Sequence, residues 1–63
     1  MRVFVREART EMGLSIRQLS NLTGIPKSTL YDLEDERFMP RLDDLIAIMQ
    51  ALHCTFEDLV SVE

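Results

Sequence analysis

The sequence predicts an all-α fold of five short helices in one domain. Apolar residues recur at helical spacing in five segments, glycine or proline separates several of these segments, and no segment has convincing strand-like alternation. Val3-Phe4-Val5 is the one candidate for a strand, and it is too short to outweigh the helical pattern around it. Because 63 residues are too few for two hydrophobic cores, we expect residues 1–63 to form a single domain.

The first helix is expected over about residues 2–12. Val5, Ala8 and Met12 form an apolar stripe at spacings of three and four residues, and Gly13 follows as a residue that ends helices. Apolar runs in the chain are too short for a membrane span or for the core of a signal peptide. We therefore expect no membrane segment.

The second helix has both a start signal and a stop signal. Ser15 and Gln18 are spaced as a capping box, in which the serine hydroxyl accepts from the Gln18 amide N–H while the glutamine side chain reaches back. Leu19 and Leu22 are expected to face inward. Gly24 supplies the left-handed backbone conformation that ends the helix.

The third helix is expected over about residues 27–35, after the short turn Gly24-Ile25-Pro26, with Leu30 and Leu33 facing inward. Two helices of about eight residues joined by such a turn have helix-turn-helix geometry. In this geometry the first helix braces the second at a steep angle, so that the outer face of the second can enter the major groove of DNA. The second and third helices are therefore predicted to form a DNA-binding unit.

The last two helices complete the predicted fold. The fourth is expected over about residues 42–52, where Asp43 and Asp44 in the first turn complement the helix dipole. Thr55 is predicted to cap the short fifth helix. The apolar residues of that helix are Phe56, Leu59 and Val60.

Charge is divided unevenly along the chain. Seven basic and eleven acidic residues give a net charge of −4, which argues against a simple polybasic nucleic-acid binder. Residues 1–41 contain all seven bases and six of the acids, whereas residues 42–63 contain five acids and no base. The folded domain is therefore expected to present one mildly basic face and one strongly acidic face.

The joint spacing of residues from about Val5 to Leu59 resembles the Cro and phage-repressor (XRE-type) helix-turn-helix family. The matching residues are Arg9, Gly13-Leu14-Ser15, Leu19, Gly24-Ile25, Ser28-Thr29-Leu30, Leu33-Glu34, Pro40, Leu45, Ala51-Leu52 and 56–59. The resemblance implies a lambda-repressor-like domain that binds double-stranded DNA as a repressor-like transcriptional regulator. Because the single cysteine, Cys54, cannot form an internal disulfide, we expect the protein to be cytoplasmic.

The resemblance also implies roles for individual residues. Arg9 and Glu34 match a structural pair that ties the first helix to the recognition helix. Lys27, Ser28 and Asp32 match positions that commonly face bases. With further residues that match phosphate contacts or lie on the outer helix face, the predicted DNA-contact set is Arg17, Lys27, Ser28, Thr29, Tyr31, Asp32, Arg37 and Arg41.

Helical geometry supports the outer face independently of the resemblance. With Leu30 and Leu33 inward, steps of about 100° turn Ser28, Tyr31 and Asp32 outward. A lysine at the N-terminal tip can pair with guanine O6 and N7, and an aspartate can accept from cytosine N4. The alternative for each charged residue is an ordinary solvated side chain.

Four residues depart from the family pattern. Ile16 replaces a polar residue that touches the DNA backbone, and Ser20 replaces an alanine where the two helices cross. Glu36 and His53 replace glycines that follow the third and fourth helices. Together with the acids near the end of the recognition helix, these departures predict a weak or selective DNA binder.

Some apolar residues exceed what so small a core can bury. These are Ile46, Met49, Val60 and Val62. They predict the interface of a homodimer, which a two-fold DNA reader requires. The alternative is that they are apolar residues scattered over the surface.

Two other classes of function compete with a DNA-binding regulator. A protein-interaction module on the same scaffold, such as an antitoxin-like partner, is favoured by the acidic half and by Ile16 at a contact position. An enzyme is not expected, because the sequence has no Ser/His/Asp set and no glycine loop for phosphate. No cofactor or metal is expected either, since His53 has no partner at metal spacing and Cys54 reads as a small buried hydrophobe.

Overall fold

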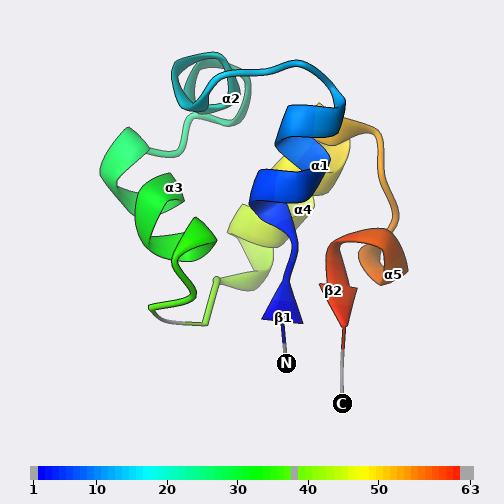
Figure 1. The fold of residues 1–63 in the computed structure, drawn as a ribbon. Helices are drawn as coiled ribbons and strands as arrows, with labels where there is room; N and C mark the ends of the chain where they lie inside the picture. The colour runs from blue at the N-terminus through cyan, green and yellow to red at the C-terminus, as the bar shows by residue number, and fades with distance from the viewer. Residues whose placement is uncertain (1, 38, 62–63) are drawn as a thin grey trace.

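The computed structural model describes residues 2–37 and 39–61. In these residues it has five helices and a two-stranded antiparallel sheet (Figure 1). The elements in chain order are β1 (Arg2–Val3), α1 (Val5–Glu11), α2 (Ile16–Thr23), α3 (Lys27–Glu34), α4 (Leu42–Leu52), α5 (Phe56–Leu59) and β2 (Val60–Ser61). All five predicted helices are present, and the predicted all-α class is confirmed.

The two ends of the described chain form a short ribbon that the sequence did not predict. Val3 lies opposite Val60 in the β1–β2 pair, and the Phe4 amide donates to the Leu59 carbonyl at 2.7 Å. The first helix therefore begins at Val5 rather than near residue 2, and Val60 belongs to a strand rather than to the fifth helix. The β-branched valines favour extended backbone, but the pairing that makes them a strand joins residues far apart in sequence.

Serine and threonine caps begin α2 and α5 as predicted. The Ser15 hydroxyl accepts from the Gln18 amide at 3.1 Å, and the Gln18 side chain accepts from the Ser15 amide at 2.8 Å. Thr55 forms the equivalent reciprocal pair with Asp58. These bonds satisfy amide groups that have no partner inside the helix, so each fixes where its helix begins.

Four helices are followed by a residue with a positive φ angle. Two of these residues are the glycines Gly13 (φ 72°) and Gly24 (φ 76°), and two are Glu36 (φ 56°) and His53 (φ 53°). After Gly13, Glu36 and His53, the next amide donates to the carbonyl five positions earlier at 3.0–3.1 Å, as in a Schellman motif. The two helix ends that lack the family's glycine therefore retain the backbone conformation that glycine adopts most easily.

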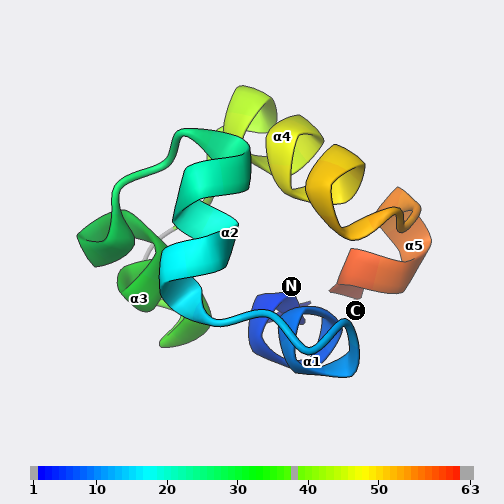
Figure 2. The same ribbon diagram turned by 90° about the horizontal axis from the view of Figure 1, so that it is seen from above.

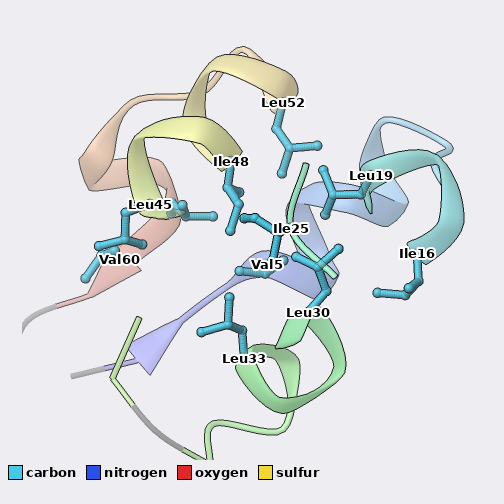
Figure 3. Packing of buried hydrophobic residues seen from close by; sticks show 11 residues of the cluster. Val5, Ile16, Leu19, Ile25, Leu30, Leu33, Leu45, Ile48, Leu52 and Val60 are labelled. Carbon is cyan, nitrogen blue, oxygen red and sulfur yellow. The ribbon is translucent and has the colours of Figure 1, made fainter. Parts of the chain in front are cut away.

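The core lies where α1, α2, α3 and α4 meet, and Figure 3 shows side chains from all four helices converging there. It is closed on one side by α5 and β2. Its members are Val5, Ile16, Leu19, Ile25, Leu30, Leu33, Leu45, Ile48, Leu52, Leu59 and Val60. Helix α2 packs against both α3 and α4, and α1 also packs against both. The core therefore holds the helix-turn-helix pair in a fixed orientation.

Two predicted core residues are exposed. Leu22 is 60% exposed and Met12 is 47% exposed. The buried Ile16 and Leu19 set the inward direction of α2, and Leu22 lies about 120° around the helix from Ile16. Ile16 itself is 7% exposed, so its predicted role as a contact position is wrong.

Candidate nucleic-acid interface

The turn between α2 and α3 is held by side-chain hydrogen bonds as well as by packing. Ile25 fills the angle between the helices and is 5% exposed. The Ser20 hydroxyl donates to the Ile25 carbonyl at 2.6 Å, and the Ile25 amide donates to the Thr23 hydroxyl at 3.2 Å. Ser20, which replaces the family's alanine, therefore closes the turn with a hydrogen bond rather than leaving a polar group unsatisfied at the crossing.

Helix α3 has one buried face and one exposed face. Leu30 and Leu33 are 0% and 1% exposed, and Figure 3 shows both pointing from α3 into the core. Lys27, Ser28 and Tyr31 are exposed on the outer face. Thr29 and Asp32, the other α3 members of the predicted contact set, are half-buried. Helix α3 lies at the edge of the molecule in both ribbon views, so this face is open to a large partner (Figures 1 and 2).

Glu34 anchors the end of α3 to α1. Its side chain is 2% exposed, and its carboxylate accepts from Arg9 Nε at 2.7 Å and from Arg6 Nε at 3.1 Å. Arg9 also donates to the Leu14 carbonyl at 2.8 Å. The hydrogen bonds to Glu34 raise the pKa of both guanidinium groups, so both stay charged.

The pair of Arg9 and Glu34 was expected from the resemblance, whereas Arg6 was not. Arg6 and Arg9 are three residues apart in α1 and therefore lie on the same side of that helix. That spacing was the signal in the sequence that could have added Arg6 to the pair. Two arginines on one buried carboxylate restrict how α3 can tilt relative to α1.

The acids near the end of α3 are paired with arginines. Arg37 Nε lies 3.7 Å from Asp32 Oδ1 and 3.6 Å from Asp35 Oδ2, and Arg2 Nε lies 3.6 Å from Glu36 Oε1. The negative charge expected to repel phosphate is therefore compensated locally. Arg37 is therefore already paired with Asp32 and Asp35. Because both ion pairs are exposed and weak, a phosphate could replace these carboxylates as the partner of Arg37.

Among residues 2–37 and 39–61, Arg17 and Lys27 are the two basic side chains that form no ion pair. They lie in the first turns of α2 and α3, where backbone amide groups without helical partners also favour anions. Arg41, by contrast, lies 3.3 Å from Asp43. Uncompensated positive charge therefore gathers at the N-terminal ends of the two helices.

A model of the family described as helix-turn-helix matches residues 5–59, which include α1 to α5. The chain belongs to the XRE-type helix-turn-helix family. This is a family of DNA-binding regulators, and the resemblance stated from the sequence is confirmed. A search of curated proteins found no match to the chain.

In this XRE-type protein the described residues of the predicted dimer surface are not all exposed. Ile46 is 44% exposed and Met49 is half-buried on α4. Val60 is 4% exposed because β2 carries it into the core, so its place on a dimer surface was wrongly predicted. Val62 lies outside the described residues. Leu42, 70% exposed and one turn before Ile46, extends the remaining apolar strip.

Other chemistry is sparse in the described part of this XRE-type protein. No three His, Cys, Asp or Glu side chains there are grouped so that they could hold a metal ion. None of the helices described is long and apolar enough to cross a membrane. Cys54 is half-buried, and burial, with a smaller contribution from Asp58, raises the pKa of its thiol.

Proposed function

We propose that this protein is a sequence-specific, repressor-like regulator that inserts α3 into the major groove of double-stranded DNA. The single observation that carries the proposal is the outer face of α3, where Lys27, Ser28 and Tyr31 are exposed while the opposite face is buried and anchored. A helix presented in this way can bring side chains to base edges without a change in fold.

Base contacts are assigned to the first turn of α3. Lys27 carries an unpaired charge and can pair with guanine O6 and N7, while Ser28 can donate to or accept from a base edge. Asp32 is the third candidate, but it is half-buried and lies near Arg37. Backbone phosphates are assigned to Arg17, Thr29, Tyr31, Arg37 and Arg41.

The charge distribution supports a binder with modest affinity and strong discrimination. The net charge of −4 opposes long-range attraction to DNA. At close range the two unpaired cations, Arg17 and Lys27, would attract phosphates or base edges. Each phosphate that is neutralised lowers the logarithm of the binding constant by about 0.9 per tenfold increase in salt. We expect a slope of about −2 to −4 per protomer, set by Arg17, Lys27 and whichever of Arg37 and Arg41 exchange partners.

We further propose that the protein binds DNA as a homodimer joined through α4. Leu42, Ile46 and Met49 are spaced at four and three residues and therefore share one side of that helix. A two-fold dimer would read half-sites about one helical turn of DNA apart. Analytical ultracentrifugation of the Ile46→Glu variant tests the interface, because a charge there should shift a dimer to monomer.

The experiment for DNA binding is selection from random duplexes, followed by fluorescence anisotropy with the enriched site. Lys27→Ala and Ser28→Ala should each weaken binding to that site by about 5- to 150-fold, since a good base contact discriminates by about 1–3 kcal/mol. The double variant Arg2→Ala, Glu36→Gln is the control, because it removes an exposed ion pair outside the predicted contact set without leaving the Glu36 carboxylate unpaired. The proposal fails if no sequence is enriched and wild type retards no duplex at low salt.

A second candidate function is a protein-interaction module on the same scaffold. The acidic half of the chain favours it, since residues 42–63 contain five acids and no base. Ile16 no longer supports it, because that side chain is in the core. This function would be favoured if the protein captures a protein partner in a pull-down and enriches no sequence in the selection from random duplexes.

A further inference from the structure

A groove of about 650 Å³ lies between α1, the end of α4 and α5. Its apolar lining comes from Phe4, Ala8, Met12, Leu52 and Cys54. In both ribbon views α5 lies at the opposite end of the molecule from α3 (Figures 1 and 2). The volume is in the range of sites that hold a few side chains or a small organic ligand, about 300–1,000 Å³.

Three carboxylates flank this lining. Glu7 and Glu11 come from α1 and Asp58 from α5. Among the residues the structure describes, none of the three forms an ion pair, whereas the acids at the end of α3 do. Asp58 also accepts from the Thr55 amide at 3.3 Å, which leaves its second oxygen available.

Two other charged or titratable groups stand near the groove. The Arg2 guanidinium lies over the Phe4 ring, 5.2 Å from its centre, and is also paired with Glu36. His53 contributes to the wall at the end of α4. Within the described residues the local charge is therefore negative at Glu7, Glu11 and Asp58, and the Arg2 guanidinium brings positive charge to the Phe4 end.

We propose that this groove docks a basic segment of a partner protein. The segment would carry one or two apolar anchor residues with lysine or arginine on either side. The apolar floor would hold the anchors, and the three carboxylates would pair with the flanking cations. A phosphate backbone would be repelled here. A second copy of the chain fits less well, because its two unpaired cations, Arg17 and Lys27, lie on different helices and not along one continuous segment.

This inference goes beyond the proposed function and does not depend on it. The groove and the outer face of α3 are separate surfaces, so a basic partner and DNA can be bound at the same time. The occupant is recognised through complementary charge at an exposed rim. Each such pair contributes a factor of about 1.5 to 5 in affinity.

The test uses the full chain labelled with ¹⁵N and a synthetic amphipathic twelve-residue peptide of leucine and lysine. We expect amide shifts at α1 and at the α4–α5 junction, and binding that weakens as salt is raised. The double variant Glu7→Gln, Glu11→Gln should weaken binding about 2- to 25-fold. The matched double variant Asp44→Asn, Glu57→Gln removes the same charge outside the groove lining and should change affinity less than twofold.

Several results would overturn the proposal. Shifts centred on α3 or on Leu42 and Ile46 would place the peptide elsewhere. Equal weakening by both double variants, or equal binding of a leucine–glutamate peptide, would show that the groove does not select a basic ligand. Groove shifts that follow protein concentration without peptide would assign the groove to a second copy, and absence of binding at 1 mM peptide would leave the groove without this role.

Discussion

His53→Gly should stabilise the protein, because His53 ends α4 in a conformation that disfavours a side chain. Its φ and ψ are 53° and 43°, and the following amide, from Cys54, donates to the Met49 carbonyl at 3.1 Å. A non-glycine residue in this conformation costs about 1–2 kcal/mol. Glycine avoids that cost but loses about 0.5–1 kcal/mol more through the flexibility of the unfolded chain.

The net gain expected from His53→Gly is therefore about 0.5–1 kcal/mol. The exposed imidazole has no ion pair or side-chain hydrogen bond within the described residues, so its removal has little to offset this gain. A domain of this size has a total stability of roughly 3–9 kcal/mol, so the change is a substantial fraction. The melting temperature should rise by about 2–8 °C.

The assay is thermal unfolding followed by circular dichroism, at equal protein concentration for each variant. His53→Ala is the matched control, because it removes the imidazole but keeps the Cβ atom that causes the strain. Alanine also adopts this conformation less readily than histidine, so His53→Ala should melt at or below the wild-type temperature. The reasoning is refuted if the glycine variant melts no higher than the alanine variant.

Three further changes test other parts of the fold. Glu36→Gly relieves the same backbone conformation but loses the exposed ion pair with Arg2, so we expect a smaller gain of about 0–1 kcal/mol, measured by urea unfolding. Glu34→Ala leaves the α1 arginines without their buried carboxylate and should cost about 3–5 kcal/mol, and a loss below 1 kcal/mol would contradict the anchoring role. Ser20→Ala removes the hydrogen bond that closes the turn and should cost about 1 kcal/mol in the same assay, with Thr10→Ala as the control for loss of an exposed hydroxyl.

The candidate interface was predicted in outline but not in its charge balance. The outer face of α3 followed from the positions of Leu30 and Leu33, because residues on one helix have fixed angular relations. Which cations are available to DNA did not follow, since that depends on neighbours from other elements. The ion pairs of Arg37 with Asp32 and Asp35 could not be distinguished in the sequence from solvated charges.

The sequence alone determined the number and order of the helices, the caps that begin α2 and α5, and the turn between α2 and α3. These features depend on hydrogen bonds between residues at most five positions apart, so Ser15, Gln18 and Gly24 were enough to place α2. Tertiary structure alone decided the β1–β2 ribbon, the burial of Ile16, the exposure of Leu22 and the acidic groove. Each of these features depends on contacts between residues that are far apart in the sequence. The free energy of such contacts is set only when the helices pack together.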